Sequence, residues 1–411
     1  MRMIDMHCDT LWKLIDLDGQ GDLMKNDCHI SIPSMKKAGT VVQLFACFTK
    51  AADYKKKGGY DAAFVHLQDM VRYLRQQQER YSEDLALAYS WNDVDRNDFA
   101  GRISAIMTVE EGGILNGHME RLEELYQHGI RLMTPVWNYE NCIGYPNSRK
   151  KSVMWKGLKP FGKEVIERMG ELGMIIDVSH ASDGTFRDIM AIAKGTVIAS
   201  HSNCREIAKH PRNLTDEMIW QLADAGGIAG LNLYGPFLGR EKESRIEDMT
   251  AHILHMLNKG GSDFPAIGTD FDGFGEMEVM EIGHPDEMEK LWEMLKQKGV
   301  KEYREKQAAE RIYGLLPEDQ GQWLKALWEE FEAYETPEAK FAHVLDNCQP
   351  LFLNDASNGK SWEEHQVKKS QIYKRNRKTG EGSEVIWEYM KELVDKHIAL
   401  GHVIDDEKDG R

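Results

Sequence analysis

Residues 3–7 read MIDMH, a short apolar run that ends in a histidine, and seven similar runs follow it along the chain. They are VVQLFACF (41–48), ISAIMTVEEGG (103–113), GIRLMTPVW (129–137), GMIIDVSH (173–180), TVIASHS (196–202), GGIAGLNLY (226–234) and PAIGTDFDG (265–273). Amphipathic stretches such as HMERLEELYQHG (118–129) separate them. Near-continuous apolar strands alternating with helices are typical of a parallel sheet buried on both faces. Eight such units predict an α/β fold of the (β/α)8 TIM-like barrel type, although an open doubly wound sheet has the same alternation.

The texture of the sequence changes at about Val300. Residues 301–411 have helical periodicity and charged faces, contain no strand candidate and end in the helical stretch SEVIWEYMKELVDKHIALG (383–401). A chain of 411 residues is also long enough for one large barrel and a second unit. The sequence therefore predicts a barrel over residues 1–300 and an all-α C-terminal extension over residues 301–411.

Composition excludes several classes of partner. The formal net charge is −16 and no basic stripe offsets it, so we expect no nucleic-acid partner. The six cysteines are scattered without CxxC spacing, which favours reduced thiols over disulfides or a thiolate zinc site and indicates a cytoplasmic protein. No apolar stretch reaches the ~18 residues of a membrane span and no leader pattern precedes Met3, so we expect no membrane association.

Histidine and carboxylate residues stand at the ends of five of the eight predicted strands. They are His7 and Asp9 at the first, Glu110 at the third, His180 at the fifth, His201 at the sixth and Asp270 at the eighth. The carboxyl ends of barrel strands form the active-site face of this fold. A lone residue of this kind is more often a hydrogen-bonded cap than a ligand, but five strand ends together favour a metal site.

Imidazole and carboxylate ligands suit Zn²⁺ or a similar divalent ion. Side chains two residues apart on a strand point the same way, so His7 and Asp9 can hold one ion together. A bridging carboxylate would let two ions share one water, and Glu110 is the candidate bridge. Glu111 is adjacent to it, and only one of these two side chains can face inward.

Five motifs, in this order, carry a family resemblance: IDMHCDT (4–10), VEEGG (109–113), DVSHAS (177–182), SHSNCREIAKHPRN (200–213) and GTDFDG (268–273). Over about the first 300 residues the chain resembles the membrane dipeptidase (renal dipeptidase) family of zinc peptidases. The resemblance implies two Zn²⁺ ions per chain and small dipeptide substrates. It assigns His7 and Asp9 to one zinc, His180 and His201 to the other, and Glu110, rather than Glu111, to both. It places the catalytic Asp270 beside the bridging water.

The resemblance also implies substrate-binding residues. Arg212, in HPRN (210–213), matches the arginine that grips the free carboxylate of the substrate, although an isolated arginine is usually part of a surface salt bridge. A planar guanidinium can hold a carboxylate through two hydrogen bonds. Where vertebrate members have a histidine that polarises the scissile carbonyl, this chain has Trp137. The indole N–H of Trp137 and the amide of Asn138 or Asn141 remain as possible donors.

Residues 308–354 of the extension resemble the C-terminal helices of HD-domain phosphohydrolases. Asp346 matches the last metal ligand of that family, but the earlier histidine and the His-Asp pair have no counterpart, and no His-Asp dipeptide occurs in the chain. We therefore expect a catalytically empty half-domain. Its apolar faces favour a role in packing or self-association, which is compatible with a homo-oligomer.

The leading hypothesis is a zinc-dependent dipeptidase that hydrolyses dipeptides with a free C-terminal carboxylate through a metal-bridging hydroxide, with Asp270 moving the proton to the leaving amine. One alternative is another barrel metallohydrolase, acting on cyclic amides, lactones or phosphoesters. Those relatives usually open with HxH and a lysine bridge, whereas this chain has HxD and Glu110. The other alternative is a non-catalytic binding protein with a relict site, against which the complete ligand set argues.

Overall fold

The computed structural model describes residues 2–16 and 20–406. The chain divides into two compact units, Met1–Arg304 and Glu305–Arg411, and each is described by itself. The division lies four residues beyond the boundary that the change in sequence texture predicts.

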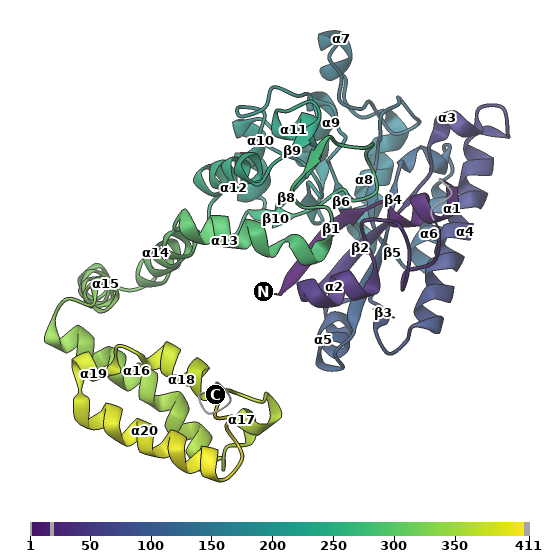
Figure 1. Cartoon of the computed structure of the whole chain (residues 1–411). Coiled ribbons are helices and arrows are strands. Elements are labelled where there is room, and N and C mark those ends of the chain that lie inside the picture. The colour runs from purple at the N-terminus through teal and green to yellow at the C-terminus, as the bar shows by residue number, and fades with distance from the viewer. Residues whose placement is uncertain (1, 17–19, 407–411) are drawn as a thin grey trace. The chain divides into compact units, whose positions relative to one another are not determined.

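Eight parallel strands form a barrel in the first unit (Figure 1). They are β1 (Met3–Cys8), β2 (Thr40–Phe48), β4 (Ile103–Glu110), β5 (Ile130–Thr134), β6 (Ile175–Asp177), β7 (Val197–Ile198), β8 (Ala229–Leu231) and β10 (Pro265–Ile267). Their order is β7-β6-β5-β4-β2-β1-β10-β8, and a bridge between Ala199 and Ala229 links the two ends of this path. The TIM-like barrel prediction is confirmed, and each of the eight apolar runs coincides with one strand to within one residue or encloses it.

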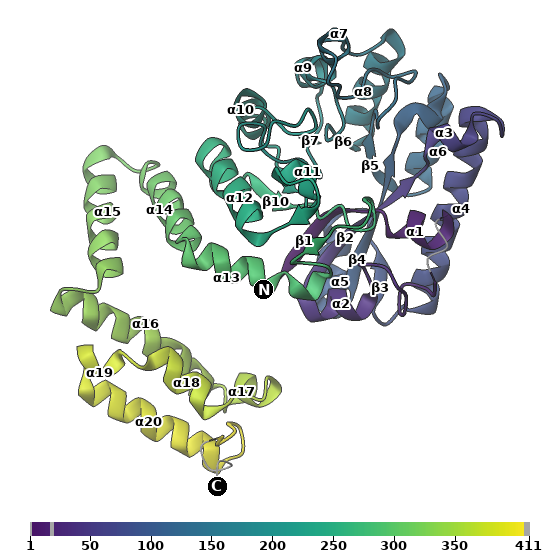
Figure 2. The same ribbon diagram turned by 45° about the horizontal axis from the view of Figure 1, so that its top comes forward.

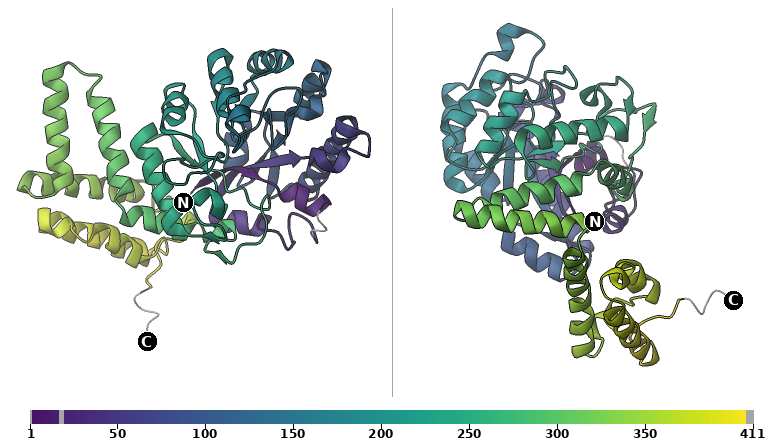
Figure 3. Two further views of the ribbon diagram at one scale, coloured as in Figure 1. Left: turned by 90° about the horizontal axis from the view of Figure 1, so that it is seen from above. Right: turned by 90° about the vertical axis from the view of Figure 1, so that its left-hand side faces the viewer.

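Helices surround the strands of the first unit (Figures 2 and 3). They are α1 (Thr10–Asp16), α2 (Ile32–Ala38), α3 (Ala51–Tyr54), α4 (Gly59–Arg80), α5 (Trp91–Phe99), η1 (Gly112–Leu115), α6 (Met119–Gln127), α7 (Lys151–Met154), α8 (Pro160–Leu172), α9 (Asp183–Ile192), α10 (Asp216–Asp224), α11 (Gly235–Leu238), α12 (Ile246–Gly260), η2 (Pro285–Glu287) and α13 (Glu289–Gln297). Three short strands were not predicted: β3 (Leu85–Leu87) pairs with β4, and β9 (Glu243–Ser244) pairs with β11 (Val279–Met280). Two or three residues are too few for a recognisable period.

Local sequence signals fix where the helices begin and end. Ser182 caps α9 by accepting a hydrogen bond from the backbone N–H of Thr185, and Thr215 caps α10 in the same way. Gly173 ends α8 with φ of 71°, a left-handed conformation that a residue with a Cβ rarely adopts. The chain then turns directly into β6. Because the barrel strands are parallel, their carboxyl ends lie at the same face of the barrel.

The second unit is helical, as predicted. It contains α15 (Glu318–Ala333), α16 (Pro337–Ala356), α17 (Lys360–Glu364), α18 (Lys369–Asn376), α19 (Thr379–Gly382), α20 (Glu384–Ala399) and most of α14 (Val300–Tyr313). Its small apolar core includes Trp362, Met390 and Val394. All six cysteines of the chain are free thiols. Among the described residues, no helix combines the length and apolar character that crossing a bilayer requires.

Candidate active site

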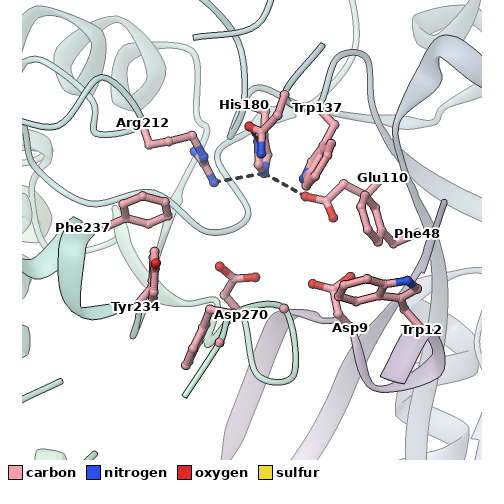
Figure 4. Close-up of a pocket in the computed structure, with 14 residues that line it drawn as sticks. Asp9, Trp12, Phe48, Glu110, Trp137, His180, Arg212, Tyr234, Phe237 and Asp270 are labelled. Carbon is pink, nitrogen blue, oxygen red and sulfur yellow. Dashed lines mark hydrogen bonds and ion pairs between the residues drawn. The ribbon is translucent and has the colours of Figure 1, made fainter. Parts of the chain in front are cut away.

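Side chains from five barrel strands converge at the carboxyl ends of the strands. Asp9, Glu110, His180 and Asp270 among them line a pocket (Figure 4). His7 belongs to β1 and Asp9 follows it, Glu110 is the last residue of β4, and the other three lie in the loops after β6, β7 and β10. The six converging residues, all buried, are His7, Asp9, Glu110, His180, His201 and Asp270. These are the residues that the sequence placed at the strand ends.

The converging side chains form three overlapping groups that could each hold a metal ion. The groups are His7, Asp9 and Glu110; Glu110, His180 and His201; and His7, His201 and Asp270. Within each group the ligand atoms lie within 4.8 Å of one another. Glu110 Oε1 lies 2.8 Å from His180 Nε2, while its Oε2 lies 3.7 Å from His7 Nε2. The two oxygens of Glu110 therefore face different histidines, as a bridging carboxylate would.

Buried negative charge accumulates among these groups. Burial, reinforced by the charge of Asp9, raises the pKa of Glu110 well above its usual range. Burial and Asp9 also raise the pKa of Asp270 to about 6, against the opposing effect of His7. The buried oxygen Asp9 Oδ1 has no hydrogen-bond partner in the described part of the chain. A divalent cation would offset this charge and occupy the unpaired oxygen, so the donor set fits a metal ion.

The histidines differ in their electrostatic surroundings. Burial lowers the pKa of His180 and His201 well below the usual value, and the charges of Arg212 and His7 lower it further. Both rings are then neutral and offer a nitrogen lone pair. Burial acts in the same direction on His7, but the carboxylates of Glu110 and Asp9 raise its pKa to about 10.

The adjacent glutamates have different surroundings. Glu110 lines the pocket, whereas the side chain of Glu111 accepts hydrogen bonds from the backbone N–H of Gly113 and from Asn141 Nδ2, both at 2.7 Å. Burial raises the pKa of Glu111 to about 7. Asn141 is therefore committed to Glu111 and does not line the pocket. Glu111 is a structural residue of the loop after β4.

A buried carboxylate beneath His201, Asp177, was missed by sequence reasoning. Asp177 accepts five hydrogen bonds, from Thr134, Ser179 and Ser200. The hydroxyl of Ser200 donates to Asp177 Oδ2 at 2.7 Å, so it is an acceptor for the Nδ1–H of His201, also at 2.7 Å. This arrangement fixes the tautomer that directs the Nε2 lone pair of His201 toward the pocket.

A second buried carboxylate, Asp5 in β1, has the same role beneath the loop that follows β10. Asp5 Oδ1 accepts from the backbone N–H of Thr269 at 2.9 Å and of His7 at 3.3 Å, and its Oδ2 accepts from the Thr269 hydroxyl at 2.7 Å. Asn232 Nδ2 donates to Asp270 Oδ2 at 2.8 Å. The available signal was an aspartate inside an apolar strand, since a buried carboxylate must be paired.

Trp137 and Asn138 both line the pocket, and their contacts differ. Asn138 Oδ1 lies 3.1 Å from His180 Nδ1 and accepts a hydrogen bond from its N–H, so the lone pair of His180 lies on Nε2, which faces Glu110. The ring of Trp137 packs against Phe48, with a centroid distance of 4.7 Å, and lies 6.1 Å from the His180 ring. Asn138 therefore orients a histidine, and Trp137 contributes an apolar surface.

Arg212 is a buried cation, with 5% of its surface exposed. Its Nη2 lies 3.2 Å from His180 Nε2 and donates to the carbonyl of His201, and its Nη1 donates to Ser202 Oγ. No carboxylate of the described residues lies within 4.0 Å of the guanidinium in an ion pair, and its buried Nε has no acceptor. Burial lowers the pKa of Arg212 to about 10, so the group stays charged at neutral pH.

The pocket has a volume of about 250 Å³. Besides the ligand groups and Arg212, its walls are largely aromatic: Trp12, Phe48, Trp137, Tyr234, Phe237 and Phe274. A small concave site that combines convergent polar groups with aromatic surface is typical of a small-molecule site. The pocket suits a short substrate.

Two family models match the chain. The model of the membrane dipeptidase family (peptidase family M19) matches residues 1–310, and that of the HD domain matches residues 275–387. The second match covers the HD-like part of the sequence, in which Asp346 is exposed.

Similar proteins include dipeptidases. An uncharacterised dipeptidase of Schizosaccharomyces pombe is 28% identical over 290 residues, covering 66% of this chain and 69% of that protein. The dipeptidase verJ of Clonostachys rogersoniana is 31% identical over 196 residues, covering 47% and 50% of the two chains. A metallopeptidase from Rhodobacter sphaeroides, solved with a phosphinate mimic of the dipeptide L-Ala-D-Ala, shares the fold with a TM-score of 0.64 at 21% identity, covering 73% of this chain and 93% of that one. Because the family match spans 310 of 411 residues, the chain belongs to the membrane dipeptidase family and is a metal-dependent peptidase.

Proposed function

We propose that the barrel is a zinc-dependent dipeptidase whose substrates have a free C-terminal carboxylate. His7 and Asp9 would hold one Zn²⁺, His180 and His201 would hold a second, and Glu110 would bridge them. The neutral His180 and His201, the divided contacts of Glu110 and the unpaired Asp9 Oδ1 support this assignment. Each ion would then have three protein ligands and room for water.

When bound, Zn²⁺ supplies an activated water and stabilises the negative charge that develops on the carbonyl oxygen. Asp270 is the proton carrier in this proposal. Asn232 holds its Oδ2, and its Oδ1 lies 3.8 Å from His7 Nε2. A carboxyl group whose pKa lies near the working pH can take a proton from the attacking water and deliver it to the leaving amine. Asn138 holds the ring of His180, and Ser200 holds that of His201.

The observation that carries the proposal is the buried Arg212. A buried cation without a carboxylate partner is costly, and an anionic ligand group would compensate it. Arg212 Nη2 lies 3.2 Å from His180 Nε2, next to the ligand groups, so a carboxylate held there is a short, fixed distance from the reacting carbonyl. A substrate with one residue beyond the scissile bond matches this spacing. The phosphinate dipeptide mimic bound by the Rhodobacter sphaeroides relative supports the same substrate size.

The experiment compares a dipeptide, its C-terminal amide and a matched tripeptide, using zinc-loaded wild type and Arg212→Ala. Wild type should prefer the dipeptide. Loss of a charge-assisted double hydrogen bond should lower kcat/KM for the dipeptide roughly 30- to 1000-fold, and Arg212→Lys should restore little of it. Arg187, an exposed arginine on α9, provides the control, and Arg187→Ala should retain wild-type rates. Equal cleavage of all three substrates, or an unchanged dipeptide rate in Arg212→Ala, would show that the proposal is wrong.

A further inference from the structure

Three aromatic rings form one side of the pocket: Trp12 from α1, Phe48 at the end of β2 and Trp137 in the loop after β5. We call them the aromatic wall. The Trp12 and Phe48 rings meet edge to face, with centroids 5.1 Å apart, and Phe48 packs on Trp137 at 4.7 Å. Such packing holds large rings in fixed positions. Figure 4 shows Trp12 and Phe48 on the side of the pocket opposite Arg212.

The rings on the Arg212 side have a different task. The Arg212 guanidinium carbon lies 5.1 Å from the centroid of the Phe237 ring, and Tyr234 packs edge to face against Phe237 at 4.9 Å. A ring face beneath a guanidinium is a favourable cation–π arrangement. Phe237 and Tyr234 therefore support the arginine. The rings of the aromatic wall do not support Arg212 in this way, and the proposed mechanism does not use them.

The direction in which a dipeptide lies follows from the proposed function, on which this inference rests. Its carboxylate is held by Arg212 and its scissile carbonyl lies between Glu110 and Asp270. The N-terminal residue must then point away from Arg212, toward Asp9 and the aromatic wall. Its α-amino group then lies on the Asp9 side of the pocket. Its side chain faces the rings.

We infer that the aromatic wall selects dipeptides whose N-terminal residue has a large apolar or aromatic side chain. Such a side chain would cover ring surface that a small side chain leaves in contact with water. An acidic side chain at this position would lie beside the carboxylates of Asp9 and Glu110 and be repelled by them. No lysine or arginine offsets this repulsion, because Arg212 is the only one among the described lining residues and it holds the C-terminal carboxylate. A basic side chain gains cation–π attraction but leaves most of the apolar surface uncovered.

The test measures kcat/KM of the zinc-loaded full chain for five dipeptides ending in glycine, which removes the stereochemistry of the second residue. The N-terminal residues are Phe, Leu, Ala, Asp and Lys. Phe-Gly and Leu-Gly should be cleaved at least about 10-fold more efficiently than Ala-Gly, with Asp-Gly last.

Trp12→Ala should reduce the Phe-Gly to Ala-Gly ratio to below about 3, and Trp12→Leu serves if the alanine variant fails to fold. The matched control is Trp91→Ala, an exposed tryptophan on α5, which should keep the wild-type ratio. If wild type cleaves no dipeptide, the proposed function is wrong and this inference falls with it. If wild type cleaves all five equally, prefers Lys-Gly or Asp-Gly, or keeps its ratio in both Trp12 variants, the inference alone is wrong.

Discussion

Replacing Ser200 with alanine isolates the contribution of one hydroxyl group to the proposed metal site. The Ser200 hydroxyl donates to Asp177 and accepts from His201 Nδ1, each at 2.7 Å, and all three residues are buried. Ser200→Ala leaves the Nδ1–H of His201 without an acceptor and removes the constraint on its tautomer. Asp177 keeps four of its five hydrogen bonds, so the carboxylate beneath the site stays largely satisfied.

Two independent considerations give a similar magnitude. An unsatisfied buried donor costs about 1–3 kcal/mol. Loss of the hydrogen-bond partner of a metal-binding histidine typically lowers metal affinity by about 10- to 100-fold, or about 1.4–2.8 kcal/mol. We therefore expect the Zn²⁺ dissociation constant of the site that contains His201 to rise by about 10- to 100-fold. Titration against a chromophoric chelator measures this constant, and denaturant unfolding of the metal-free protein measures the accompanying loss of stability.

Ser104→Ala is the matched control for this experiment. Ser104 is a buried serine near the start of β4 that accepts a hydrogen bond from Asn97 Nδ2 at 3.1 Å, at the opposite end of the barrel. Its loss should lower stability without changing metal affinity. The reasoning fails if Ser200→Ala binds Zn²⁺ within twofold of wild type, or if Ser104→Ala weakens binding to the same extent.

Two further predictions concern backbone spacing and pH. A Cβ at position 273 would displace the carboxylates of Asp9 and Asp270. Gly273→Ala should therefore lower Zn²⁺ affinity and dipeptide turnover and change the unfolding midpoint little. An unchanged Zn²⁺ affinity would contradict this prediction. Burial lowers the pKa of His252 to about 4, and its Nδ1 accepts from the backbone N–H of Cys204. Only the unfolded chain binds a proton there between about pH 6.5 and 4, so the free energy of unfolding should fall by about 3 kcal/mol as pH drops through this window. In His252→Gln this part of the pH dependence should disappear, and an unchanged slope would refute the assignment.

The barrel was predictable because its strands are buried on both faces and its helices have one apolar face. Near-continuous apolar runs therefore alternate with amphipathic helical stretches, and eight such runs occur along the sequence. Strands β9 and β11 were not predictable, since each has two residues and depends on partners far along the chain. The sequence predicted the boundary between the units four residues before the division that the structure shows. Helix α14 begins at Val300 and runs across the division at residue 304 without a break in pattern.

The chemical groups of the site were predictable and their supports were not. His7, Asp9 and His201 were identifiable because imidazole and carboxylate at strand ends have few structural uses in combination. Ser200 was not identifiable in this way, since a serine beside a histidine is common in sequences. Its role as the acceptor for His201 depends on its hydrogen bond to Asp177, which only the structure shows. Trp137 posed a different problem. In the sequence, Trp137 stands where related proteins have a histidine, which suggested a polar role for its indole N–H. In the structure its ring packs against Phe48 and forms part of an apolar wall.

The two strand aspartates show how the fold connects stability to the site. Asp5 in β1 and Asp177 in β6 are fully buried, and each binds backbone N–H groups and hydroxyls of the loop after the neighbouring strand. A buried carboxylate is costly to desolvate, and an apolar residue of similar size is often at least as stabilising. Stability alone therefore does not explain why both aspartates stand in otherwise apolar runs. Their partners, Thr269 and Ser200, immediately precede Asp270 and His201, so each aspartate fixes the position of a residue that the proposed chemistry needs.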